Sequence, residues 1–205
     1  SILARPGLVD ITLSRWVDKS VDSDPRLEEV AGELAKCLGN LVYTTDHRSL
    51  EEVVGDLLRE GKLTLATAES CTGGLVAESI TSIAGSSDYF IGSFITYSNE
   101  MKIRMLGVDE NLIEKHGAVS PEVALAMAEG ARKRTGADYA ISITGIAGPS
   151  GGTATKPVGL VFIALAGPEG TTFEEHKFFG GRESVRERAR VAALTMLRLK
   201  LNAER

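Results

Sequence analysis

Residues 63–83, "LTLATAESCTGGLVAESITSI", run from a short apolar stretch through a turn of small polar residues into a second apolar stretch. The pattern predicts a strand over 63–68 and a helix over 72–83. Ser70 and Cys71 lie in the turn between the two. A strand that passes directly into a helix is the repeating unit of α/β folds, so this stretch points to that fold class.

Elements of the same alternating kind surround this stretch. Ser49 and Glu52 have the spacing of a capping box, in which each side chain satisfies a backbone amide at the start of a helix. Ser120 and Pro121 suit the N-cap and the first position of another helix. The other expected strands are 89–97, 138–144, 158–166 and 171–179, and the other expected helices begin at Asn99 and span 182–200. Because the last two strands form a hairpin, we expect a three-layer α/β/α sandwich with a mixed sheet.

Residues 1–45 form a smaller segment ahead of the domain that we expect over 46–205. An alternation of apolar and polar residues predicts a strand over 8–17. Apolar residues at helical spacing predict a helix within 21–40, and "LVYTT" at 41–45 then closes a β-α-β unit. A unit of this size is too small to be very stable alone, so we expect a small α+β arm packed on the larger domain.

The composition is that of an ordinary globular protein. The 205 residues are 43% hydrophobic and 25% charged, and the chain is long enough for a substantial core. Its net charge of −5 argues against a nucleic-acid binder. Two cysteines and three histidines give neither a disulfide framework nor a metal-ligand spacing. We expect a cytoplasmic protein, because no apolar run suits a membrane span and no signal peptide is evident. Since the chain opens on Ser1, we expect a processed product or a fragment.

The turn at 69–74 is the first candidate site. Amides at the start of a helix lack helical partners, so they can hold a phosphate or stabilise an oxyanion beside a nucleophile. No lysine follows the glycines, which weakens the hypothesis that this turn binds a phosphate. Ser70 and Cys71 are both candidate nucleophiles. The alternative is structural: Ser70 or Thr72 caps the helix while Cys71 packs as a small apolar side chain.

A nucleophilic serine needs a base, and Lys102 in "TYSNEMK" (96–102) is our candidate. It lies just beyond an expected strand and can therefore reach the same edge of the sheet. Its pKa must fall from about 10.4 towards neutrality, which desolvation or a neighbouring cation achieves. Tyr97 is placed to orient the amine or relay a proton. The alternative is a solvated surface lysine, which describes most lysines.

The loop "SITGIAGPSGGT" (142–153) is the third candidate. Thr144 ends an expected strand, and the glycines that follow allow the backbone to approach a ligand closely. In an open α/β sheet, ligands bind outside the carboxyl ends of the strands, where the loops 69–74, 97–102 and 144–153 are expected to meet.

The start of the last helix adds basic residues. Arg182 is placed to bind a phosphate through two parallel hydrogen bonds. We interpret the other three arginines of that region as a solvated face that pairs with nearby glutamates; they are Arg186, Arg188 and Arg190, with Glu183 and Glu187 as partners.

Several motifs in one order resemble the CinA carboxyl-terminal family over residues 49–200: "TLATAESCTGGLVA", "GSSDYFIGSFITYSNEMK", "GVDENLIEKHGAVSPEVALAMAEGAR", "YAISITGIAGPSGGTATKPVGLV" and "FFGGRESVRERA". The resemblance implies hydrolysis of nicotinamide mononucleotide to nicotinate mononucleotide and ammonia. It further implies Ser70 as nucleophile, Lys102 as its base and Tyr97 assisting, without metal or cofactor. The substrate-binding residues we expect are Cys71, Thr72, Gly73, Asn99, Thr144, Gly145, Gly148 and Arg182, the last at the phosphate.

The same resemblance covers the arm and the partners. Residues 1–45 resemble a KH-like connector, which in two-domain members joins an amino-terminal molybdopterin-binding-like domain associated with ADP-ribose pyrophosphatase activity. Family members commonly form dimers, so we expect a homodimer or a higher homo-oligomer. The rival function is a non-catalytic nucleotide-binding or protein-interaction module linked to competence or DNA damage. The presence of Ser70, Tyr97 and Lys102 favours the enzyme.

Overall fold

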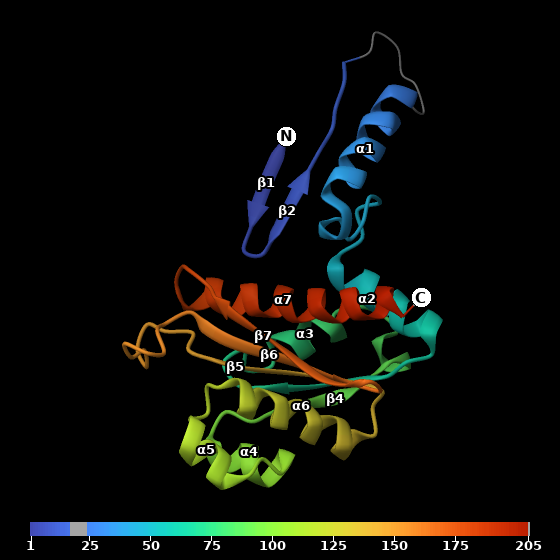
Figure 1. The fold of residues 1–205 in the computed structure, drawn as a ribbon. Helices are drawn as coiled ribbons and strands as arrows, with labels where there is room; N and C mark the ends of the chain where they lie inside the picture. Colours follow the sequence, from blue (N-terminus) through green and yellow to red (C-terminus); the bar gives the residue numbers. More distant parts are fainter. Residues whose placement is uncertain (17–23, 205) are drawn as a thin grey trace.

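A five-stranded mixed sheet lies at the centre of the molecule (Figure 1), in the computed structural model that describes residues 1–16 and 24–204. Its strands, in spatial order, are β4 (Phe90–Ile95), β3 (Leu65–Glu69), β5 (Tyr139–Gly145), β6 (Leu160–Gly167) and β7 (Gly170–Lys177). The first three run parallel, and β6 and β7 are antiparallel to their neighbours. The predicted mixed sheet and the predicted hairpin of the last two strands are both confirmed.

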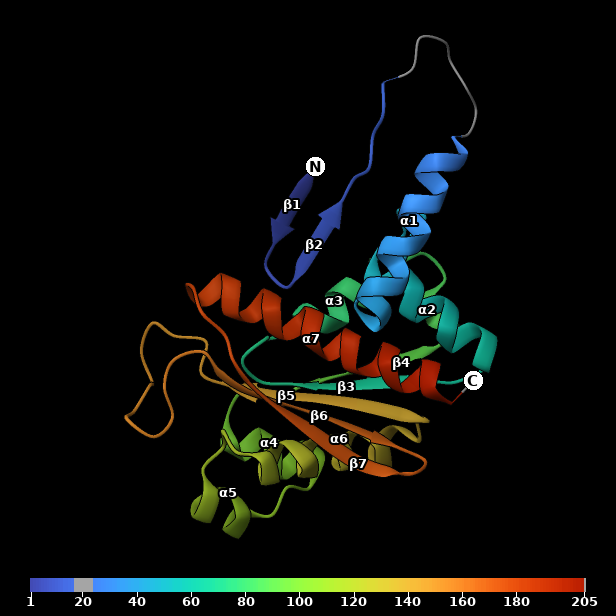
Figure 2. The ribbon, with the colours of Figure 1, turned by 45° about the horizontal axis from the view of Figure 1, so that its top comes forward.

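Helices cover both faces of the sheet (Figure 2). One face carries α2 (Leu50–Gly61), α3 (Leu75–Thr81) and α7 (Arg182–Ala203), and the other carries α4 (Asn99–Leu106), α5 (Glu110–His116) and α6 (Pro121–Thr135). Leu58, Ile141 and Leu194 are fully buried between the sheet and the first layer. Val123 and Met127 are fully buried against the second. The predicted three-layer sandwich is therefore confirmed.

The predicted helix starts are also present. Ser49 and Glu52 form a complete capping box at α2, and Ser120 Oγ accepts from the backbone amide of Val123 at the start of α6. Pro121 is the first residue of α6. These local signals specify the boundaries because each one satisfies an amide that would otherwise lack a partner.

The arm differs from the predicted β-α-β unit. It consists of the antiparallel hairpin β1 (Ile2–Arg5) and β2 (Leu8–Ile11), then α1 (Pro25–Leu38) and a single 3-10 turn, η1 (Gly39–Leu41). The strand predicted over 8–17 ends at Ile11, and its last residue, like the start of the helix predicted within 21–40, lies outside the described residues.

The strand predicted at 41–45 is wrong. Tyr43 packs against the core below the arm, and Thr44 Oγ1 accepts from the amide of Asp46 at 3.3 Å. The segment therefore folds back as a turn that leads into α2. Of the apolar residues that suggested a strand, Tyr43 contacts the core, whereas Leu41 is exposed in the 3-10 turn and takes no part in a sheet.

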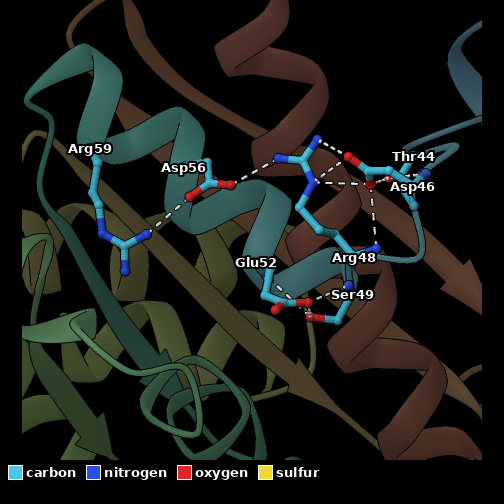
Figure 3. A network of polar contacts seen from close by, with 7 residues as sticks. All are labelled: Thr44, Asp46, Arg48, Ser49, Glu52, Asp56 and Arg59. Carbon is cyan, nitrogen blue, oxygen red and sulfur yellow. Dashed lines mark hydrogen bonds and ion pairs between the residues drawn. The ribbon is translucent and has the colours of Figure 1, made fainter.

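A chain of charged side chains fixes this turn on α2 (Figure 3). The Arg48 guanidinium pairs with Asp46 at 2.8 Å and with Asp56 at 2.9 Å. Asp56 pairs in turn with Arg59, one helical turn along α2. Hydrogen bonds from Arg48 and Thr44 hold the pKa of Asp46 well below its usual range. The network therefore ties the turn at 44–48 to the first three turns of α2.

Helix α7 joins the arm to the sheet, and here the prediction of a solvated arginine face is wrong for Arg190. Arg190 is buried and pairs with Glu51 of α2 as well as with the expected Glu187. Arg198, also buried, donates to the carbonyl of Asn40 in the arm. The arginines are covered because α2 and the arm both pack on this helix, which the helical pattern of α7 alone does not reveal.

Candidate active site

Two loops leave adjacent strand ends in opposite directions at one edge of the sheet. The connection after β3 leads to α3 on one face, whereas the connection after β4 leads to α4 on the other (Figures 1 and 2). The ends of these parallel strands are in register, Glu69 beside Ile95 and Ile143. Ser70, which follows β3, and Lys102, which lies on α4, approach each other across this divergence.

Ser70 and Lys102 are in direct contact. Lys102 Nζ donates to Ser70 Oγ at 3.1 Å, to the Thr96 carbonyl at 2.7 Å and to the Tyr97 carbonyl at 3.3 Å. Lys102 is 1% exposed, and no carboxylate among the described residues forms an ion pair with it. Burial therefore lowers its pKa to about 8. About a tenth of such amines are neutral at pH 7, and in that form the amine can accept a proton from the hydroxyl.

Cys71, the second candidate nucleophile, has a different environment. Its thiol is buried, and burial raises its pKa to about 12. Because the thiolate is the nucleophilic form of cysteine, this residue is inert at neutral pH. The buried side chain behaves as the small apolar residue of the structural alternative, and the serine beside it holds the contact with the amine.

The amides at the start of α3 are already occupied, contrary to the expectation that they face a ligand. The fully buried Glu69 carboxylate accepts from the amides of Gly74 at 3.0 Å, Val76 at 3.2 Å and Ala77 at 2.8 Å. Within the described part of the chain, the amides of Cys71 and Thr72 make no hydrogen bond to another residue. The donors left near Ser70 are therefore those of the turn and not those of the helix.

Two arginines of α7 bring the three predicted loops together. Arg182 donates to the Gly148 carbonyl at 2.9 Å and to the Tyr97 hydroxyl at 3.4 Å. Arg186 donates to the Thr72 carbonyl at 2.7 Å. The start of α7 thus contacts the turn after β3, the loop after β4 and the glycine loop after β5. Arg186 was missed among the expected solvated arginines, although its spacing of four residues from Arg182 places both on one face of the helix.

The remaining predicted residues lie around this centre in different ways. Thr144 Oγ1 donates to the Ala118 carbonyl at 2.7 Å, so its side chain anchors the segment before α6. The Tyr97 side chain is 64% exposed, and it is its backbone carbonyl that contacts Lys102. Asn99 is exposed at the first position of α4. Gly73 is exposed with a φ of +60°, next to the buried Thr72.

Two glycines of the loop after β5 are needed for close packing, and one of them also for its backbone conformation. A Cβ at Gly145 would lie 2.7 Å from a methyl of Val161, and one at Gly148 would lie 2.5 Å from a methyl of Val158. Gly148 also has a φ of +80°, which side chains other than glycine rarely adopt. The loop is therefore held tightly against the start of β6, and these two glycines are required for that packing.

Neither a metal cluster nor a membrane helix emerges from residues 1–16 and 24–204. No group of three His, Cys, Asp or Glu side chains gathers there as a metal site. No helix in the same ranges is both long enough and apolar enough to cross a membrane.

Comparison with known proteins places the chain among characterised folds. Residues 47–201 match the family model described as the CinA C-terminal domain. A CinA-like protein from Koribacter versatilis is 45% identical over 201 residues, covering 98% of this chain and 49% of that protein. The chain thus spans about half the length of the curated relatives it matches.

Solved structures of related proteins have a similar fold. The competence/damage inducible protein CihA from Agrobacterium tumefaciens has a TM-score of 0.70 at 41% identity, covering 78% of this chain and 99% of that one. A CinA superfamily protein from Klebsiella pneumoniae has a TM-score of 0.72 at 32% identity, covering 76% of this chain and 99% of that one. Both similarities extend over most of the sandwich.

Proposed function

The chain belongs to the CinA C-terminal domain family, and we propose that it is an amidohydrolase that converts nicotinamide mononucleotide to nicotinate mononucleotide and ammonia. The observation that carries this proposal is the buried contact of 3.1 Å between Ser70 Oγ and Lys102 Nζ, with the pKa of that lysine lowered to about 8. Amide hydrolysis needs an activated nucleophile and a group that protonates the departing nitrogen, and a neutral lysine beside a serine supplies both.

In the first step, neutral Lys102 donates its two N–H groups to the carbonyls of Thr96 and Tyr97 and accepts the Ser70 proton through its lone pair. Ser70 Oγ attacks the carboxamide carbon, and the carbonyl oxygen becomes an oxyanion. We assign the free amides of Cys71 and Thr72 as its donors, since those of α3 are occupied by Glu69.

In the second step, the tetrahedral intermediate collapses. The C–N bond breaks, Lys102 returns the proton to the leaving nitrogen, and ammonia departs. The nicotinoyl ester that remains on Ser70 is attacked by water, whose proton passes to Lys102 and then to the serine oxygen. One amide and one water thereby give one carboxylic acid and one ammonia, and the enzyme is restored.

In this proposal, Arg182 binds the phosphate of the nucleotide. Two of its N–H groups are engaged by Gly148 and Tyr97, and a guanidinium carries five, so donors remain for a phosphate. The exposed phenol of Tyr97 lies beside it and is free to contact the same ligand. The backbone of the glycine loop then forms the neighbouring wall.

The test is ammonia release from nicotinamide mononucleotide by the purified chain and two neighbouring variants. Ser70→Ala is expected to lower kcat by about a thousandfold or more, because the attacking oxygen is lost. Cys71→Ala is expected to retain kcat within about fivefold, since the buried thiol takes no part in the chemistry. The opposite pattern would transfer the nucleophile to Cys71.

The rival function, a nucleotide-binding or protein-interaction module without turnover, is decided by the same assay. Binding of nicotinamide mononucleotide without ammonia release, in wild type and Ser70→Ala alike, would establish the silent binder. The names of the relatives, which refer to competence and damage, say nothing of this distinction.

A further inference from the structure

Glu69 is a charged residue beside the Ser70–Lys102 pair that the proposed reaction does not use. It is the last residue of β3 and is fully buried. Its carboxylate accepts three backbone amides at distances of 2.8–3.2 Å, all from the segment 74–77 that follows the turn. A buried carboxylate is costly unless it is fully hydrogen-bonded, so this geometry is strongly specified.

The opposite side of the same turn is held by Arg186. Its guanidinium donates to the Thr72 carbonyl at 2.7 Å from the next layer of the fold. The Ser70 amide donates to the Ile143 carbonyl at 3.0 Å, which ties the start of the turn to β5. The turn is therefore fixed at its first residue, at its middle and at its end, by three different elements.

The geometry points to Glu69 and Arg186 as positioning residues for the nucleophile, and this inference rests on the proposed function. Glu69 binds the amides of the helix start, so the amides of Cys71 and Thr72 are left without a partner residue next to Ser70 in the described part of the chain. Arg186 fixes the Thr72 carbonyl and with it the orientation of the peptide that follows. Together they set both the approach of Ser70 to Lys102 and the direction of the Cys71 and Thr72 amides.

A purely structural helix cap offers a matched control. Glu52 accepts from the amide and the hydroxyl of Ser49 at the start of α2, within a capping box on a different helix. Glu69→Gln and Glu52→Gln make the same chemical change, a carboxylate to an amide, at the N-terminus of a helix. A capping role alone predicts the same consequence for both, namely lower thermal stability with unchanged kinetics.

The experiment measures kcat and KM for nicotinamide mononucleotide, together with the rate at which a fluorophosphonate labels Ser70. In labelling, the Oγ–P bond forms as the P–F bond breaks, fluoride leaves and the hydroxyl proton passes to Lys102. We expect Glu69→Gln to lower kcat and the labelling rate by about a hundredfold each while KM stays within about threefold, because the nucleophile is misplaced and ground-state binding is kept. Glu52→Gln is expected to keep both rates.

Unchanged kcat and labelling in folded Glu69→Gln would overturn the inference. If that variant does not fold, Arg186→Met decides, with the same expected loss of kcat; a rise in KM alone would instead assign Arg186 to the substrate phosphate and overturn its positioning role. Wild type that labels on Ser70 but releases no ammonia contradicts the proposed substrate only, and the labelling rates of the variants still decide. Wild type that does neither overturns both proposals.

Discussion

Two lysines at opposite ends of the sheet show how their surroundings decide what an amine can do. Lys102, at the carboxyl end of the parallel strands, is buried, touches two carbonyls and a hydroxyl, and has a pKa lowered to about 8. Lys200, near the end of α7, pairs with Glu169 and Glu204, and these hydrogen bonds raise its pKa. The first environment penalises the charge and the second stabilises it, so only the first lysine is suited to accept a proton.

The largest expected effect comes from making the first lysine permanently charged. Lys102→Arg is expected to lower kcat for ammonia release by about a thousandfold, because a guanidinium does not deprotonate near neutral pH. Lys200→Arg is the matched control and is expected to retain kcat, since its role is only to pair with two carboxylates. Equal kcat in Lys102→Arg and Lys200→Arg would contradict the assignment of Lys102 as the base.

The pH dependence gives the next largest effect. With a pKa of about 8, about one Lys102 amine in ten is neutral at pH 7. Because the neutral form is the active one, kcat/KM is expected to rise about tenfold between pH 6 and pH 7, about fivefold between pH 7 and pH 8, and then to level off. Steady-state kinetics between pH 6 and about 9.5 measure this. A profile that falls with rising pH in this range would contradict a lysine base.

The smallest expected effect concerns the second lysine. Lys200→Met removes two partly exposed ion pairs, so we expect only a slight fall in the thermal midpoint and no change in the apparent pKa of kcat/KM. Thermal unfolding and the same pH series check both. A shift in the kinetic pKa would mean that the two ends of the sheet are electrostatically coupled.

The sequence predicted the features that local chemistry determines. Three of these features satisfy backbone groups within a few residues, so neighbouring residues in the sequence are sufficient to predict them. They are the capping box of Ser49 and Glu52, the helix start at Ser120 and Pro121, and the turn between β6 and β7. The strand predicted at 41–45 is absent because Tyr43 contacts the core of the larger domain instead of a strand partner, and Leu41 is exposed.

At the candidate site, the sequence indicated Ser70 and Lys102 but not their environment. The contact between Ser70 and Lys102 joins residues 32 positions apart, and the burial that lowers the lysine pKa comes from the packing of several elements. Glu69 and Arg186 were missed for the same reason, since their partners are backbone groups of a turn whose path appears only in the fold. The signal present in the sequence is a glutamate at the end of an apolar strand, one residue before a candidate nucleophile.

The protonation of Lys102 is the central claim, and a direct titration tests it. With lysines labelled with ¹³C at Cε, the NMR signal that disappears in Lys102→Arg identifies this residue. We predict that this signal titrates near pH 8, while that of Lys200, identified in the same way, stays in its charged form throughout the range in which the protein remains folded. A Lys102 signal that remains charged above pH 10 would contradict the account, because the amine would then be unable to take the Ser70 proton at neutral pH.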